Sequence, residues 1–146
     1  MNSELDGKIV LVTGGAGGIG SVISESFAEQ GAKVIVHYKH SKEKAEIIAK
    51  KIKGVAIYAD LTDSEQTKEL FDDIIDKEGK IDICIANAGK YPKDYAPLWE
   101  IGIERWNNTI STNLSLTYNT SRYFLKHVAE TTVSYTHLTL PTIRTV

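Results

Sequence analysis

The hydrophobic residues of the chain come in short runs separated by amphipathic segments. The runs cover residues 9–12, 34–36, 55–59 and 81–86, and they are rich in valine and isoleucine without a clean alternation of polar residues. This pattern is typical of strands that are buried on both faces of a parallel sheet. Because a helical segment separates each run from the next, the sequence predicts an α/β fold, a doubly wound parallel sheet with right-handed crossovers.

The segments between the runs carry apolar side chains at helical spacing, so each expected helix has one apolar face. These faces comprise Ile19, Ile23 and Phe27, then Ala45, Ile48, Ala49 and Ile52, then Leu70, Phe71, Ile74 and Ile75. Gly31, Gly54 and Gly79 each follow a helix, where a left-handed C-terminal cap is expected. A longer helix is predicted over residues 104–128, with Ile110, Leu114, Ser121, Leu125 and Val128 along one side.

The composition is that of one globular domain of 146 residues, with 42% hydrophobic and 25% charged residues. A formal net charge of −2, with lysine and arginine spread along the chain, argues against a nucleic-acid partner. No apolar run approaches the ~20 residues that span a bilayer, and the N-terminus lacks a signal-peptide pattern, so we expect a cytoplasmic protein without a membrane partner. We predict no metal site, a solvated His127 near a helix end, and a buried, unreactive thiol at Cys84.

A glycine-rich turn, TGGAGGIG at residues 13–20, follows the first apolar run and begins the first helix. Glycines allow a tight turn and let a pyrophosphate approach the backbone, and a helix N-terminus presents free N–H groups to it. We therefore expect the amides of residues 14–20 to form an anion cradle for a dinucleotide. The second run, which starts near Lys33, supplies the remaining context of the motif; the alternative is a flexible turn that binds no ligand.

The second apolar run ends with His37, Lys39 and His40. Sites that prefer NAD usually place an acidic residue about 20 positions after the glycines, where it holds the ribose hydroxyls. No acidic residue occurs here before Glu43, and cations would favour the 2′-phosphate of NADP. The sequence predicts a preference for NADP(H), with Lys39 as the phosphate partner and NAD still possible; the alternative is that Lys39 is a solvated loop lysine.

Five features, in this order, resemble the short-chain dehydrogenase/reductase family over residues 5–130. They are Leu5-Asp6-Gly7-Lys8, the TGxxxGxG spacing of Gly14, Gly18 and Gly20, Asp60-Leu61 after the third run, Asn87-Ala88-Gly89 after the fourth, and Trp106 with Asn113-Leu114 as W-x6-N-L. The resemblance implies a Rossmann-like sheet in the strand order 3-2-1-4. The same glycines also fit TGxxGxxG of the extended branch with its sugar-nucleotide epimerases, an alternative that Asn87-Ala88-Gly89 disfavours.

The resemblance also implies a role for each matching residue. Gly14, Gly18, Ile19 and Gly20 would line the pyrophosphate, Asp60 would accept from the adenine amino group with Leu61 beside the ring, and Asn87, Ala88 and Gly89 would lie along the ribose near the nicotinamide. Asn113 would be one of four catalytic residues, holding a water in a proton relay. The alternatives are that Asp60 caps the segment that begins at Thr62, and that Asn113 is a polar packing residue.

The implied activity is hydride transfer between a nicotinamide and a carbonyl or alcohol of a small-molecule substrate. In the family, the acid/base tyrosine and its lysine form Tyr-x-x-x-Lys in the helix after the long one. No such sequence follows the long helix here, since Tyr135 is followed four positions later by Thr139. We therefore expect this chain to be inactive alone, and a second hypothesis is a dinucleotide-binding module without catalysis.

The end of the chain differs in composition from the rest, with six threonines and no glycine or acidic residue in residues 131–146. Residues 133–146 resemble a translated sequencing adapter. We therefore expect a truncated dinucleotide-binding domain over residues 1–132, followed by a non-native or unstructured tail; the alternative is a natural truncated protein. The full-length form is expected to be a homo-oligomer, with the long helix pairing with a second subunit.

Overall fold

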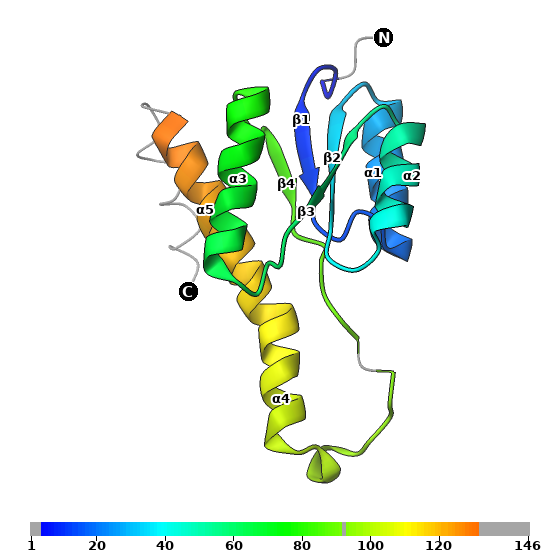
Figure 1. Cartoon of the computed structure of the whole chain (residues 1–146), viewed down its shortest axis with the longest axis vertical. Coiled ribbons are helices and arrows are strands. Elements are labelled where there is room, and N and C mark those ends of the chain that lie inside the picture. Colours follow the sequence, from blue (N-terminus) through cyan, green and yellow to red (C-terminus); the bar gives the residue numbers. More distant parts are fainter. Residues whose placement is uncertain (1–3, 92, 132–146) are drawn as a thin grey trace.

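The structure, a computed structural model that describes residues 4–91 and 93–131, is a three-layer α/β fold (Figure 1). Its strands are β1 (Ile9–Val12), β2 (Lys33–Tyr38), β3 (Val55–Tyr58) and β4 (Ile83–Ile85). The helices between them are α1 (Gly18–Glu29), α2 (Lys42–Lys51) and α3 (Ser64–Glu78). All strand pairs are parallel and the sheet order is β3-β2-β1-β4, which confirms the predicted order 3-2-1-4. The tail proposed for residues 133–146 lies outside the described residues.

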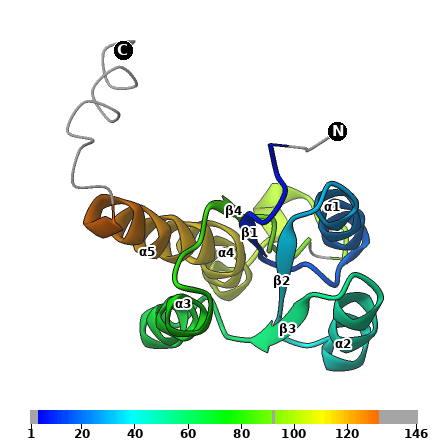
Figure 2. The ribbon, with the colours of Figure 1, turned by 90° about the horizontal axis from the view of Figure 1, so that it is seen from above.

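Helices α1 and α2 cover one face of the sheet, and α3 and the long C-terminal helix cover the other (Figure 2). The central strand β1 shows the consequence for the sequence. Ile9 and Leu11 pack into the cluster on the α3 side, whereas Val10 and Val12 pack into the cluster on the α1 and α2 side. Since successive side chains of a strand point to opposite faces, a strand covered on both sides has no polar position.

Two of the predicted helix faces are buried as expected. Ala45 and Ala49 of α2 are buried, and Leu70, Phe71 and Ile74 of α3 are buried. Ile19 is an exception, because its side chain is 73% exposed although we grouped it with Ile23 and Phe27. It lies in the first turn of α1, beside the glycine-rich turn, and not over the sheet core.

The predicted helix caps are correct at two glycines and wrong at the third. Gly31 and Gly79 have φ angles of +90° and +81°, the left-handed conformation expected after a helix. At the end of α2, however, Lys53 is the left-handed residue, with φ of +56°. Gly54 is required for a different reason: a Cβ there would lie 2.3 Å from the carbonyl oxygen of Val34. Close approach to β2 therefore explains this glycine.

The long helix comprises α4 (Ile103–Ile110), a π-helical turn η2 (Ser111–Ser115) and α5 (Leu116–Thr131), after a short 3₁₀ turn η1 (Leu98–Glu100). The buried residues of α5 are Leu116, Asn119, Thr120 and His127. The predicted stripe does not face this core, since Leu114 and Leu125 are 63% and 59% exposed.

His127 is buried, so the prediction of a solvated histidine is wrong. Its side chain is 6% exposed, and its Nε2 accepts a hydrogen bond from the backbone N–H of Ile81 at 3.1 Å. The reason is that α5 packs beside α3 and against the segment that enters β4, which sequence periodicity alone does not show.

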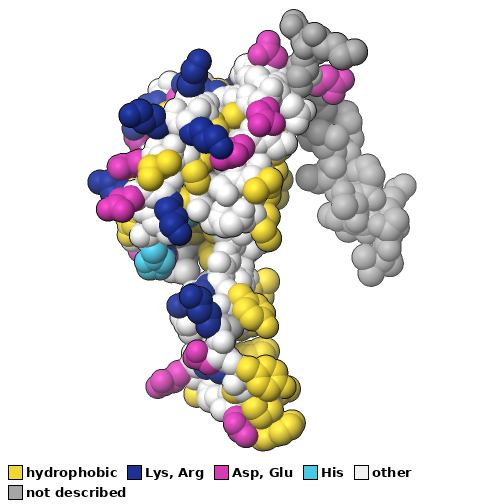
Figure 3. All heavy atoms as spheres, turned by 90° about the vertical axis from the view of Figure 1, so that its right-hand side faces the viewer, with side chains coloured by type: hydrophobic (Ala, Val, Ile, Leu, Met, Phe, Trp, Pro, Cys, Tyr) yellow, Lys and Arg dark blue, Asp and Glu magenta, His cyan; other side chains and the backbone are white. Residues whose placement is uncertain are grey.

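Apolar side chains are exposed on α4 and on the segment before it, which extend beyond the sheet (Figures 1 and 3). The exposed residues there are Tyr91, Tyr95, Leu98, Trp99, Ile103 and Trp106. In this narrow part of the molecule, no other described element packs on them. Among the described helices, none has the length and apolar character needed to cross a membrane.

Candidate functional site

The glycine-rich turn lies where the carboxyl ends of three parallel strands meet. The N–H of Thr13 donates to the carbonyl of Ile85 in β4 at 3.0 Å, and the N–H of Gly15 donates to the carbonyl of His37 in β2 at 3.0 Å. The turn is thereby tied to the strands on both sides of β1. This edge of an open parallel sheet is where α/β proteins bind their ligands.

The three motif glycines differ in what surrounds them. A Cβ on Gly20 would lie 2.1 Å from the carbonyl oxygen of Gly14, and Gly14 itself has φ of +62° and lies against Ala88. Those two glycines are therefore required by the packing of the turn. A Cβ on Gly18 would meet no atom within 4 Å. Gly18 thus keeps open a surface that a ligand could approach, which is what a phosphate cradle needs.

The amides of the turn are only partly available, and the expectation that all of residues 14–20 form the cradle is wrong. Gly14 donates to the ring Nδ1 of His37 at 3.0 Å, Gly15 donates to the carbonyl of His37, and Gly17 donates to the carbonyl of Gly14. The amides of residues 18–20, the first turn of α1, have no acceptor among the residues that the structure describes. The part of the turn that could bind an anion is therefore the N-terminus of α1, where the helix dipole favours a negative charge.

His37 is buried beside the glycine-rich turn and is not a cation, although its place in the sequence next to Lys39 suggested a positively charged strand end. Its side chain is 2% exposed; Nδ1 accepts from Gly14, and Nε2 donates to the carbonyl of Ala59 at 3.0 Å. Burial lowers the pKa of His37, and this outweighs the hydrogen bond to Ala59 and the nearby Asp60 carboxylate, which raise it. The sequence signal for a buried, neutral His37 was its position inside a strand that is buried on both faces.

Lys39 and Asp60 form an ion pair at the ends of β2 and β3, with 2.6 Å between Nζ and Oδ2. The other carboxylate oxygen accepts from the N–H and the hydroxyl of Thr62 at 3.0 and 2.7 Å. Desolvation tends to raise the pKa of Asp60, but the hydrogen bonds from Lys39 and Thr62 hold it below its usual value. Since a carboxylate has about four acceptor sites, Asp60 can still accept from another donor.

The cap of α3 is Asp63, whose side chain accepts from the N–H groups of Glu65 and Gln66. Asp60 is therefore not the cap of this helix, although it does hold the turn at Thr62. The side chain of Leu61 is 3% exposed and packs in the core on the α3 side.

The segment after β4 is joined to the glycine-rich turn. The side-chain amide of Asn87 donates to the carbonyls of Thr13 and Gly14 at 3.0 and 3.3 Å, and the N–H of Ala88 donates to the hydroxyl of Thr13 at 3.0 Å. Asn87 thus ties the end of β4 to the end of β1, and its Nδ2 would also lie 2.8 Å from a Cβ on Gly20.

Asn113 lies in the π turn and reaches the same segment. Its Oδ1 accepts from the N–H of Lys90 at 3.1 Å, and its Nδ2 donates to the carbonyls of Lys90 and Thr109, each at 3.0 Å. A Cβ on Gly89 would lie 2.8 Å from Asn113 Oδ1. The structure therefore brings together Asn113 and the Asn87-Ala88-Gly89 segment, and π turns frequently occur at functional sites.

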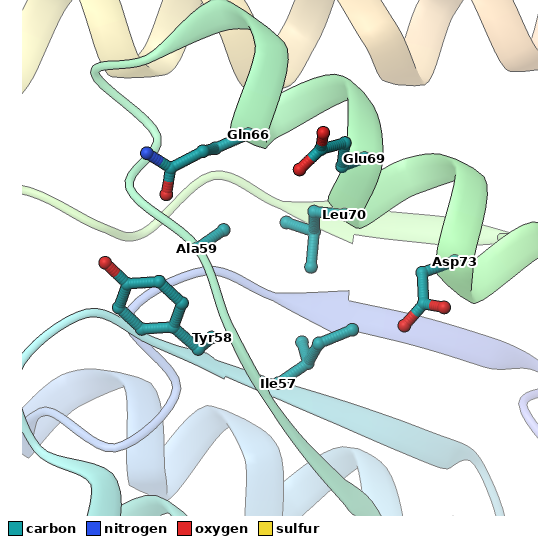
Figure 4. A pocket seen from close by; sticks show the side chains of 7 residues that line it. All are labelled: Ile57, Tyr58, Ala59, Gln66, Glu69, Leu70 and Asp73. Carbon is teal, nitrogen blue, oxygen red and sulfur yellow. The ribbon is translucent and has the colours of Figure 1, made fainter.

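A separate hollow lies between the edge strand β3 and α3 (Figure 4). It is lined by Ile57, Tyr58, Ala59, Gln66, Glu69, Leu70 and Asp73. Its two carboxylates disfavour an anionic ligand, and it contains none of the expected cofactor residues. In the part of the chain that the structure describes, no group of three or more His, Cys, Asp or Glu side chains could hold a metal ion.

Curated proteins of known name are similar to this chain in sequence. Versicolorin reductase 1 of Aspergillus parasiticus is 35% identical over 134 residues, which are 88% of this chain and 50% of that protein. Elsinochrome reductase 1 of Elsinoe fawcettii is 33% identical over 87% of this chain and 49% of its own length. The chain thus spans about half the length of the curated relatives it matches.

Solved structures agree with these relatives. A short-chain dehydrogenase from Burkholderia cenocepacia, in complex with NADP, has a TM-score of 0.79 at 29% identity, over 86% of this chain and 52% of that one. A short-chain type dehydrogenase/reductase from Mycobacterium marinum has a TM-score of 0.81 at 28% identity, over 88% and 52%. The family model described as short chain dehydrogenase matches residues 8–133. This chain therefore belongs to the short-chain dehydrogenase/reductase family of oxidoreductases.

Proposed function

We propose that this chain binds an NAD(P) dinucleotide at the first turn of α1 and supplies the cofactor-binding part of an oxidoreductase for a carbonyl/alcohol pair. The observation that carries the proposal is the open surface at Gly18, beside the three amides of residues 18–20 and between glycines whose own packing is tight. Glycines lose more conformational entropy on folding than other residues, so a run of them is destabilising. The run is useful where a pyrophosphate must approach the backbone amides closely.

We assign the residues to the dinucleotide in the order in which they follow the sheet edge. Gly14, Gly18, Ile19 and Gly20 would lie along the pyrophosphate, Asp60 and the backbone of the buried Leu61 would lie at the adenine, and Asn87, Ala88 and Gly89 would lie at the nicotinamide ribose. When bound, the nicotinamide supplies the hydride chemistry. The chain's own part is to bind, to orient, and, through Asn113, to hold the segment that follows β4 beside the reacting end.

NADP(H) is the cofactor that the charges favour. Lys39 directly follows β2, at the position where sites that prefer NAD usually carry an acidic residue. An acidic residue there would repel a 2′-phosphate, whereas a lysine attracts it. Its pairing with Asp60 reduces the free positive charge at this edge, so the expected preference is moderate. The Burkholderia relative crystallised with NADP supports the same choice.

Reduction of a small-molecule carbonyl is the proposed direction of the reaction, because relatives that match this chain are named versicolorin reductase, elsinochrome reductase and hydroxynaphthalene reductase. The second candidate is a dinucleotide-binding module without turnover.

Titration of NADPH fluorescence with the purified chain tests the proposal, with NADH in a parallel titration and an oxidoreductase assay on a panel of ketones. Saturable binding that is tighter for NADPH supports the proposed site. Dinucleotide binding without turnover of any ketone supports the second candidate, a dinucleotide-binding module. Failure to bind either dinucleotide contradicts the proposal, and tighter binding of NADH contradicts the assigned role of Lys39.

Oligomerisation is proposed for the full-length form. The exposed Leu114, Tyr118 and Leu125 on one side of the long helix support it, because an apolar helix face of this kind is typical of subunit contacts. Size-exclusion chromatography with light scattering tests this prediction, and a monomer of the full-length form would contradict it.

A further inference from the structure

His37 holds two consecutive amides of the glycine-rich turn, one with its side chain and one with its backbone. The N–H of Gly14 donates to ring Nδ1 at 3.0 Å, and the N–H of Gly15 donates to the carbonyl oxygen of the same residue at 3.0 Å. Sequence separation between Gly14 and His37 is 23 residues, so only the paired strands β1 and β2 bring them together.

The other ring nitrogen reaches the next strand. Nε2 donates to the carbonyl of Ala59 at 3.0 Å, and Ala59 immediately precedes Asp60. One imidazole therefore joins the turn expected at the pyrophosphate to the strand end expected at the adenine. Both bonds require a single tautomer, with the proton on Nε2 and the lone pair on Nδ1.

We propose that His37 is a positioning residue, which keeps the glycine-rich turn in its dinucleotide-binding conformation only while its imidazole is neutral. The inference rests on the proposed dinucleotide function. A proton on Nδ1 would face the N–H of Gly14, so two donors would oppose each other where a hydrogen bond now forms. The amide of Gly14 would then have to move, and with it the turn that leads to the first residues of α1.

The charged groups around the ring are few. The carboxylate of Asp60, which follows β3, raises the pKa of His37, and Lys39, which follows β2, forms an ion pair with that carboxylate. Strand β1 and the turn at residues 13–20 contribute no titratable side chain, and Tyr58 is the titratable residue of β3. Burial of the ring lowers the pKa of His37, so the neutral form is the one present at neutral pH.

The first test follows the backbone amides of the 146-residue chain by NMR as pH is lowered from 8 to 5. We expect Gly14 and Gly15 to shift together below the ordinary histidine pKa of 6.5, while circular dichroism shows the fold intact. His37→Asn, whose side-chain oxygen can accept from Gly14 but does not titrate, should abolish this shift. His40→Asn replaces an exposed histidine of the same segment and should leave the shift unchanged.

The second test measures binding of NADH and NADPH over the same pH range. For the wild type we expect affinity for both dinucleotides to fall about tenfold on acidification, as loss of one buried hydrogen bond predicts. His37→Asn should bind with an affinity that does not change with pH, and His37→Leu should bind about tenfold more weakly at neutral pH. The use of NADH removes any contribution from cations near a 2′-phosphate.

Two results would overturn the inference: an unchanged pH dependence in His37→Asn, or global unfolding of the wild type at the pH where Gly14 shifts. The second result would make the role of His37 merely structural. If the wild type bound neither dinucleotide at any pH, the proposed function would fail instead, and the amide titration would still decide whether His37 holds the turn. Should His37→Leu not fold, the comparison of wild type with His37→Asn suffices.

Discussion

Separate replacement of Gly18 and Gly20 by alanine distinguishes a glycine needed for packing from a glycine needed for a ligand. Both residues lie in the first turn of α1, and both belong to the motif. Their surroundings are opposite. A methyl group at position 20 would lie 2.1 Å from the carbonyl oxygen of Gly14, whereas a methyl group at position 18 would meet nothing within 4 Å.

The structure gives the size of each effect. The contact in Gly20→Ala is roughly 1 Å or more short of an ordinary nonbonded distance, and its partner is backbone that cannot rotate away. Overpacking of this kind costs about 3 kcal/mol, which lowers the melting temperature on the order of 10 °C. Gly18→Ala instead lowers the conformational entropy of the unfolded chain, and it should therefore stabilise the fold by about 0.5 kcal/mol. Its methyl group should weaken dinucleotide affinity at least about tenfold, because it occupies the open surface of the cradle.

The assay combines thermal unfolding by circular dichroism with NADPH fluorescence titration for the wild type and both variants. The expected outcome is a fold loss confined to Gly20→Ala, together with a binding loss in a fully folded Gly18→Ala. Wild-type affinity in Gly18→Ala would refute the cradle at the first turn of α1. An unchanged melting temperature in Gly20→Ala would refute the packing described for the turn.

Three further predictions concern side chains around the site and the core. Lys39→Gln should weaken NADPH binding about tenfold and spare NADH, because a charge-assisted contact is lost and Asp60 is left unpaired; equal losses for both dinucleotides, or a similar loss in the control Lys42→Gln, would contradict it. His127→Leu should lower the free energy of unfolding in a urea titration by about 2 kcal/mol, because the buried N–H of Ile81 loses its hydrogen-bond acceptor. Unchanged stability would contradict the buried hydrogen bond between Ile81 and His127. Burial raises the pKa of Cys84 to about 12, so thiol-reactive disulfide reagents should modify it only after unfolding, and rapid labelling of the folded chain would show the thiol to be accessible.

The fold could be predicted from the sequence in most respects, because its signals are local and repeated. Runs such as residues 9–12 lack polar positions since both faces of β1 are covered. Two departures depend on contacts with distant parts of the chain. His127, expected to be solvated, is buried and accepts from Ile81, and the left-handed position after α2 falls on Lys53, while Gly54 is required by its close approach to β2.

The candidate site could be predicted in its residue types but not in its bonding. Spacing identified Gly14, Gly18 and Gly20 as a group, yet their different surroundings depend on Ala88 and Asn87, which lie more than 60 residues later in the chain. Likewise, Lys39 was expected to be either the partner of a 2′-phosphate or a solvated loop lysine, and its ion pair with the carboxylate of Asp60 was not predicted.

The sequence by itself determined the order of strands and helices, the parallel sheet and the position of the glycine-rich turn, because hydrophobic period and glycine spacing are properties of neighbouring residues. Only the tertiary structure decided which amides of the turn remain available, that His37 is a neutral acceptor, and that His127 is buried. Hydrogen-bond partners and desolvation depend on groups brought together from distant parts of the chain, so no local pattern encodes them.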